Sequence, residues 1–202
     1  MAQQIITQPA TLAVSLDDAK RNQRINVNDT ENDALILAQL AAAIRMAEEY
    51  TRRAFITQKW IYETTNLYPT LSIPRPPLQK VYDTVKYINW NGVSFAVLSN
   101  TYFLNKIFEP GRLIFKQGYF PFPIGAGAIY PWFSSNNGAD NFWRGTVSLE
   151  FDCGYGDHQS DVPAEIQQGI LQIFGSLYQN RESQGIPCGA KQLLDPFRIG
   201  YL

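Results

Sequence analysis

The chain has 202 residues and a formal net charge of −1 at pH 7. It is long enough to bury a hydrophobic core, either as one large domain or as one core with an inserted subdomain. No long run of one charge sign occurs, which argues against a dedicated binder of nucleic acid or of anionic membranes.

The cysteine content indicates where the chain folds. Two cysteines, Cys153 and Cys188, are too few for a disulfide scaffold, and the N-terminus does not resemble a secretion signal. No apolar run approaches the roughly 20 residues that span a bilayer. We therefore expect reduced thiols and folding in a cytoplasm.

The N-terminal quarter predicts an extended arm followed by two helices. Residues 1–14 form the arm, and Ser15 begins a short helix in a capping-box-like pattern that runs to about Arg24. After a polar loop, a long helix is predicted over Asn32–Ala54, with Arg52 and Arg53 in its last turn. Its apolar stripe recurs at helical spacing and comprises Leu37, Leu40, Ala41, Ile44, Ala47 and Thr51.

The middle of the chain, from Thr57 to Asp152, has the pattern of β-strands. Apolar and polar residues alternate around Trp60, and Asn91-Gly92 is a strong signal for a hairpin turn. Two short strands are predicted around Pro110, and Thr146–Phe151 is expected to close the sheet.

A last helix follows from Pro163, a residue tolerated in the first helical turn. Its apolar stripe comprises Ile166, Ile170, Ile173, Phe174, Leu177 and Tyr178. Gly185 and Pro187 prevent the helix from continuing.

Candidate catalytic residues are isolated. The single histidine, His158, has no His or Cys at the spacing of a metal site, and neither Cys153 nor Cys188 lies in a catalytic motif. Glu48 and Glu49 are adjacent on a helix, so they point about 100° apart, and we expect salt bridges such as Glu48 with Arg45 or Arg52. We therefore expect no catalytic, cofactor-binding or metal site.

The segment Gln117–Trp143 is rich in aromatic residues and reads as a long exposed loop. It has two interpretations, a stacking platform for carbohydrate or nucleotide and a protein–protein surface. Only Lys116 and Arg144 supply positive charge beside it, so the protein surface is favoured over nucleic acid.

The order of segments resembles the phage head–tail connector (adaptor) proteins of long-tailed phages and gene transfer agents. No single stretch is diagnostic, but together they span nearly the whole chain in the family's order. The stretches are SLDDAK (15–20), AEEYTRRAFITQKW (47–60), IPRPPL (73–78), EPGRL (109–113), GYGD (154–157) with VP (162–163), YQNRE (178–182) and LLDPFR (193–198).

This resemblance implies an α+β fold, a small helical bundle core with a large antiparallel β insertion between the long helix and the last helix. The expected division is 1–56 for the arm and core helices, 57–155 for the insertion, and 156–202 for the last helix and a docking tail. It also implies a structural virion protein of the neck between capsid and tail, not an enzyme, assembled in the host bacterial cytoplasm.

The partners implied are the portal protein, a head-closure (stopper) or tail-completion protein, and further copies of the chain in a ring of about twelve. Double-stranded DNA would pass through the ring without sequence-specific binding. No cofactor and no membrane are implied. The residues expected to pack the core and neighbouring subunits are Leu37, Leu40, Ile44, Ile166, Ile170 and Phe174.

The C-terminal tail, Leu193–Leu202, is too apolar for a solvated end and is expected to be mobile until the portal supplies pockets. Its docking residues are Leu193, Leu194, Pro196, Phe197, Ile199, Tyr201 and Leu202.

Two other functions stay open. One is a virion enzyme, a nuclease or wall hydrolase, which would need a convergent acidic or histidine site. The other is a tail or baseplate module that binds host glycan through the aromatic loop.

Overall fold

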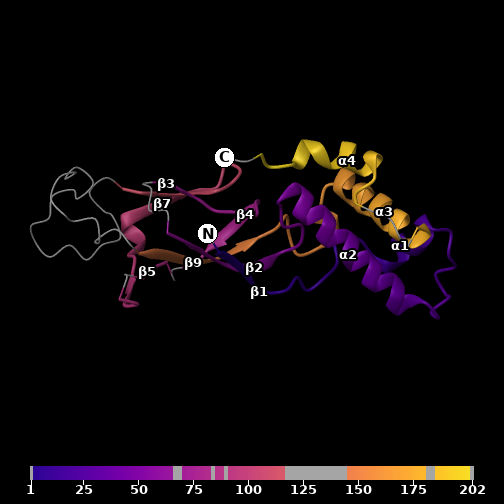
Figure 1. Cartoon of the computed structure of the whole chain (residues 1–202), viewed down its shortest axis with the longest axis horizontal. Coiled ribbons are helices and arrows are strands. Elements are labelled where there is room, and N and C mark those ends of the chain that lie inside the picture. Colours follow the sequence, from indigo (N-terminus) through magenta and orange to yellow (C-terminus); the bar gives the residue numbers. More distant parts are fainter. Residues whose placement is uncertain are drawn as a thin grey trace, which may run out of the picture. The chain divides into compact units, whose positions relative to one another are not determined.

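The computed structural model describes residues 2–65, 70–82, 85–88, 91–116, 145–180 and 185–200 (Figure 1). The chain forms two compact units. The helical unit comprises Gln8–Gln58, Arg75–Pro77 and Cys153–Leu202, and the β unit comprises Met1–Thr7, Lys59–Pro74 and Leu78–Asp152. The predicted α+β class is confirmed. The three-segment division of the chain stays a proposal, and the strand within the first seven residues groups with the β unit.

Four α-helices build the described part of the helical unit. They are α1 (Leu16–Asn22), α2 (Asp33–Thr51), α3 (Ala164–Gln179) and α4 (Cys188–Leu194). Helix α2 packs along α3, and α3 packs on α4 (Figure 1). The side chains of Leu40, Ile44, Ile166, Ile170 and Phe174 are buried in this core.

The core face of α2 differs from the predicted stripe at its N-terminal end. Leu37 is 39% exposed, whereas Ile36 and Ala43 are buried. The sequence places Leu35, Ile36 and Leu37 in succession, so apolar periodicity alone cannot fix the rotation of the helix. Including Leu37 in the core was therefore wrong for the single chain.

A buried lysine holds α1 to the start of α2. The Lys20 side chain is only 1% exposed, and its Nζ pairs with Asp33 Oδ1 at 2.5 Å. It also donates to the carbonyl oxygens of Val27, at 3.1 Å, and Asp29, at 2.7 Å. The ammonium group thus contacts two carbonyl oxygens of the polar loop and the carboxylate of the first residue of α2, so a buried side chain of α1 holds both in place. Ser15 caps α1 as predicted, because its hydroxyl accepts from the Asp18 backbone N–H at 3.0 Å.

The β unit contains two sheets. The larger has the order β1 (Ala2–Thr7), β2 (Gln58–Thr64), β9 (Thr146–Cys153), β5 (Lys86–Ile88), β6 (Ser94–Ala96), with β4 (Leu78–Val81) also pairing with β9. The smaller has the order β3 (Thr70–Ser72), β8 (Arg112–Phe115), β7 (Tyr102–Asn105). Strands β5 and β6 form the antiparallel hairpin that Asn91-Gly92 predicts, and Gly92 has φ +79°.

Strand β9 lies within the larger sheet, where β2, β5 and β4 pair with it. The sequence pattern assigns this strand to the sheet but does not predict its position between β2 and β5. Alternating apolar residues identify a strand but do not specify its neighbours, which follow from tertiary pairing. The aromatic loop Gln117–Trp143 lies outside the described residues.

We predict that Lys20→Met lowers the free energy of unfolding by about 3 kcal/mol, because it leaves Asp33 and two carbonyl oxygens without their buried partner. Urea unfolding followed by circular dichroism measures this change. The control is Arg21→Met, whose exposed side chain lies 3.7 Å from Asp18 and should cost less than about 0.5 kcal/mol. Equal losses in the two variants would show that Lys20 does not hold the loop.

Candidate functional site

The residues that could support catalysis do not assemble into a site. His158 is exposed beside a surface hollow lined by Thr11, His158, Gln159 and Ser160. The Cys153 thiol is buried and donates to the Gln58 carbonyl oxygen at 3.7 Å, while Cys188 is exposed. Among the described residues, no group of three or more His, Cys, Asp or Glu side chains could hold a metal ion. The expected lack of a catalytic, cofactor or metal site stays a prediction.

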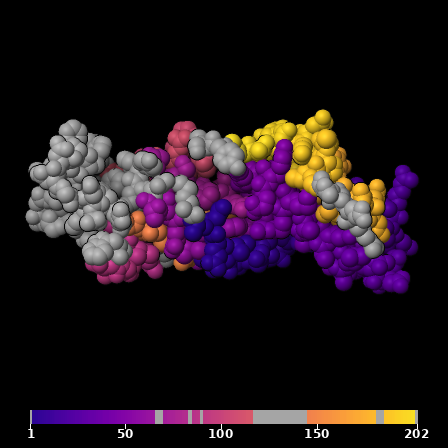
Figure 2. Space-filling model, viewed as in Figure 1, coloured from indigo at the N-terminus to yellow at the C-terminus, as the bar shows by residue number. Residues whose placement is uncertain are grey.

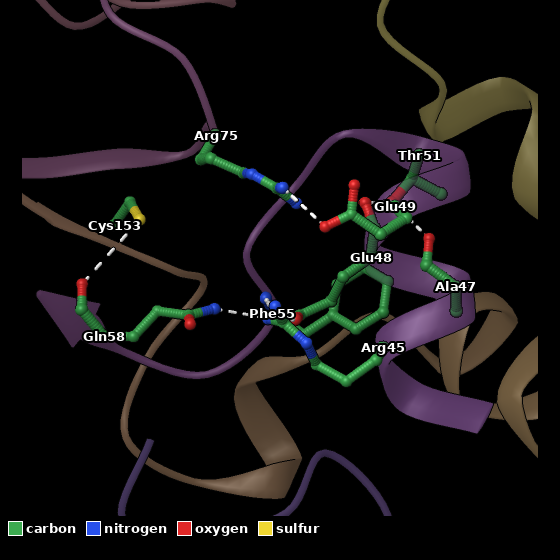
Figure 3. A network of polar contacts seen from close by, with 9 residues as sticks. All are labelled: Arg45, Ala47, Glu48, Glu49, Thr51, Phe55, Gln58, Arg75 and Cys153. Carbon is green, nitrogen blue, oxygen red and sulfur yellow. Dashed lines mark hydrogen bonds and ion pairs between the residues drawn. The ribbon is translucent and has the colours of Figure 1, made fainter. Parts of the chain in front are cut away.

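A network of polar contacts instead gathers at the C-terminal end of α2 (Figure 3). Glu48 is 3% exposed. Its Oε1 accepts from the Phe55 backbone N–H at 3.1 Å and from Gln58 Nε2 at 2.9 Å, and its Oε2 accepts from Arg45 Nη1 at 3.0 Å. One carboxylate therefore holds the helix to the segment that leaves it for β2.

Burial raises the pKa of Glu48 above its ordinary value of 4.5, against the opposing effects of the Phe55 N–H and the Arg45 charge. The expected pair with Arg45 is present, but sequence analysis missed the larger part of this arrangement. A glutamate in the last helical turn reads as a surface residue, and the apolar Phe55-Ile56 just beyond the helix is the one local sign that the turn is buried.

A second ion pair brings a distant segment to the same helix end. Arg75 Nη2 lies 2.6 Å from Glu49 Oε1, and the Arg75 side chain is only 8% exposed (Figure 3). Next to it, the Ala54 N–H donates to the Pro76 carbonyl oxygen at 3.2 Å. The stretch IPRPPL thus contributes Arg75–Pro77 to the helical unit although its flanking residues belong to the β unit.

A third segment returns from β9. The Gly154 N–H donates to the Pro77 carbonyl oxygen at 3.0 Å, and the Tyr155 N–H donates to Phe55 at 2.9 Å. Gly154 has φ +134°, and a Cβ there would lie 2.6 Å from the Ile56 carbonyl carbon. A glycine is needed here for both its conformation and its small size.

The C-terminal segment completes the arrangement. The Tyr50 hydroxyl donates to Asp195 Oδ1 at 2.5 Å, and Arg53 Nε donates to the Phe197 carbonyl oxygen at 2.6 Å. The Ile199 N–H donates to the Thr51 carbonyl oxygen at 3.1 Å, which satisfies one of the acceptors left open at the helix end. The hydrogen bond to Asp195 raises the pKa of Tyr50.

These contacts correct the expectation of a tail that stays mobile until a partner binds. Leu194 is fully buried in the core of the helical unit, where Gly169 leaves room for its side chain. Its burial therefore does not depend on the portal. Leu193, Phe197 and Ile199 are half-buried and Pro196 is exposed. Tyr201 and Leu202 lie outside the described residues. Arg52 and Arg53 follow the last turn of α2, which ends at Thr51.

We name this assembly the α2 junction: Glu48, Glu49, Tyr50, Arg53 and Phe55 with their partners Arg45, Gln58, Arg75, Pro76, Pro77, Gly154, Tyr155, Asp195, Phe197 and Ile199. It joins four of the sequence stretches on which the family resemblance depends. The arrangement holds four chain segments together at one end of α2.

We predict a pH dependence of stability from Glu48. Burial raises the pKa of this carboxyl in the folded state, so folding favours its protonated form. The contribution of the protonated carboxyl to the free energy of unfolding is therefore fully present below pH 4.5 and is lost as the pH rises through the raised pKa. The side chain of the Glu48→Gln variant cannot ionise, so the variant does not lose this stability as the pH rises. The free energy of unfolding of the variant minus that of the wild type should therefore become more positive between pH 4.5 and pH 8. Urea unfolding at both pH values measures it, and the same difference at both would contradict the assignment.

The whole chain is similar to chains in solved structures of gene transfer agent particles. A chain in the neck of an empty gene transfer agent particle, computed with C6 symmetry, matches with a TM-score of 0.75 at 19% identity. A chain in the virion of a native gene transfer agent particle matches at 0.72 and 20%, and one in the neck of a native particle, computed with C12 symmetry, at 0.70 and 18%. Each match covers 100% of this chain and 97% of the other. No protein-family model and no curated protein sequence matches.

The described chain thus shares its complete fold, both units included, with chains of gene transfer agent particles. At these identities the similarity establishes the fold and not the activity. In the described parts of the chain, no helix is long and apolar enough to cross a membrane.

Proposed function

We propose that this chain is a structural adaptor of a virion neck, without enzymatic activity, that joins a head to a tail. The observation that carries the proposal is the match to chains of gene transfer agent necks. The match covers 100% of this chain and 97% of each neck chain, so neither chain has a large unmatched part. The α2 junction is consistent with it, because its side chains bond to other segments of the helical unit.

A ring of about twelve copies is part of the proposal. The similar necks were computed with C6 and C12 symmetry, and a closed ring is the usual assembly that such rotational symmetry describes. The charge of the chain suits a passage for double-stranded DNA. Each phosphate neutralised by Lys or Arg adds affinity, so a subunit with a net charge of −1 would hold passing DNA weakly.

The portal protein is the proposed partner of the C-terminal segment, with a head-closure or tail-completion protein on the other side of the ring. The docking residues retained are Leu193, Pro196, Phe197, Ile199, Tyr201 and Leu202, without Leu194. The contacts of Tyr50 and Arg53 already hold the backbone of residues 195–199 in place. Binding would then cost less conformational entropy than it would for a mobile tail.

The glycan-binding alternative rests on the aromatic loop alone, and no observation on the described residues favours it.

We predict that native mass spectrometry of the chain mixed with its portal protein shows a complex with about twelve copies of the chain. A variant that ends at Gly200 removes Tyr201 and Leu202 and leaves all the contacts described above intact. It should keep the melting temperature of the full chain but bind the portal more weakly, since two apolar side chains contribute about 2 kcal/mol or more when buried. Repetition around a ring multiplies this loss.

The full chain analysed without portal is the control for self-assembly. A chain that stays monomeric both alone and with the portal would contradict the adaptor function. Unchanged portal binding by the shortened variant would contradict only the role of its last two residues.

A further inference from the structure

The N-terminal half of α2 has an unusual composition for a surface helix. Between Asp33 and Arg45 the sequence is ALILAQLAAAI, which contains no charged residue and one polar residue, Gln39. A helix that is apolar on every side is normally buried on every side. In the single chain this helix is buried on one side only.

The outer side of this half-helix is exposed and apolar. Ala34, Ala38 and Ala42 are exposed along its centre, Ala41 is half-buried, and Leu35 and Leu37 flank them at 45% and 39% exposure. Within the described residues of the helical unit, Leu35 and Leu37 are the two large apolar side chains that are exposed. We call these six residues, Ala34, Leu35, Leu37, Ala38, Ala41 and Ala42, the outer face of α2. The space-filling view shows that the α2 region forms a broad part of the surface on the side drawn (Figure 2).

Charged residues border this face and are engaged within the helical unit. Asp33 pairs with Lys20 at one end, and Arg45 pairs with Glu48 at the other. Glu49, one turn further, pairs with Arg75. At a rise of 1.5 Å per residue, the neutral stretch between Asp33 and Arg45 is roughly 16 Å long. A partner could therefore cover this neutral stretch and exclude water from it without breaking an ion pair.

The shape of the face suits close packing. Alanines recur at three- and four-residue intervals between two leucines, which produces a shallow groove between flanking side chains. Helices pack by inserting the ridge of one into such a groove of another, at interaxial distances of about 8 to 10 Å. An interface that is permanent is also expected to be more apolar than an ordinary surface.

We propose that the outer face of α2 is the surface by which one copy of this chain packs against the next copy in the ring. This inference rests on the proposed function. The similar necks have rotational symmetry, so each copy of a matching chain repeats around an axis. In a ring of more than two copies the contact is head-to-tail, so this face meets a different surface of its neighbour. The second copy covers the side of α2 that the single chain leaves exposed.

The test compares two substitutions at one exposed position of the face. Ala38→Glu places a charge in the proposed contact, whereas Ala38→Ser keeps the side chain small and uncharged. Because the position is exposed, both variants should melt within a few degrees of the wild type. Native mass spectrometry, with and without portal, then measures ring formation. The glutamate variant should need at least about 100-fold more protein to form the ring, since a buried, unpaired charge is strongly unfavourable. The serine variant should behave as the wild type.

The outcomes separate this inference from the proposed function. A wild-type chain that forms no ring in either preparation overturns both. A glutamate variant that forms the ring as readily as the wild type overturns the inference alone. A glutamate variant that forms the ring but no longer binds the portal assigns the face to the portal, which also overturns it. If the glutamate variant is poorly folded, Leu37→Ser serves as the second variant, with the same expected loss of the ring.

Discussion

The buried carboxylate of Glu48 is the interaction on which the helical unit depends. It connects the last turn of α2 to the backbone of Phe55 and to the Gln58 side chain, so it determines how the chain leaves the helix for the first long strand. Burial makes its charge costly, and three hydrogen bonds offset that cost only when every partner is in place. The carboxylate therefore specifies one arrangement of the helix end more than it adds stability.

That arrangement explains how a large β segment can be inserted in a helical core. The chain leaves the helical unit after Gln58, rejoins it briefly at Arg75–Pro77 and returns for its last segment at Cys153. The Cys153 thiol lies 3.7 Å from the Gln58 carbonyl oxygen. Ile56 and Gly156 form a parallel bridge just inside these positions. The two connections thus leave from neighbouring points, and the helices need no distortion to accommodate the insertion. The C-terminal segment is held at the same helix end through Tyr50 and Arg53.

Local chemistry made several elements predictable from the sequence. The Ser15 cap, the Asn91-Gly92 hairpin and the start of the last helix after Pro163 each depend on a few neighbouring residues. The exact face of α2 could not be predicted, because Leu35, Ile36 and Leu37 are all strongly apolar and only tertiary packing in the helical unit selects Ile36 for the core. The same ambiguity leaves an apolar face on the outside, which is why a partner can be inferred for it.

Long-range contacts account for the other differences. The central place of β9 depends on strands far apart in the sequence, and the burial of Leu194 depends on the space that Gly169 leaves on α3. Nothing next to Glu48 in the sequence indicates that Gln58 and the Phe55 backbone will surround it. The pairing of β9 and the burial of Leu194 arise when distant segments meet, whereas the contacts of Glu48 depend on how the chain turns after α2.

Cryo-electron microscopy of particles purified from cells that produce this chain tests the central claim most directly. The neck should be reconstructed with rotational averaging and the chain identified in the density by the helices and sheets of its described residues. The adaptor function predicts a closed ring of about twelve copies between portal and tail. The inference about the outer face of α2 predicts, in addition, that α2 of each copy lies at the contact with the next. A reconstruction in which the neck lacks this chain, or in which it occupies the tail tip or baseplate, would contradict the account.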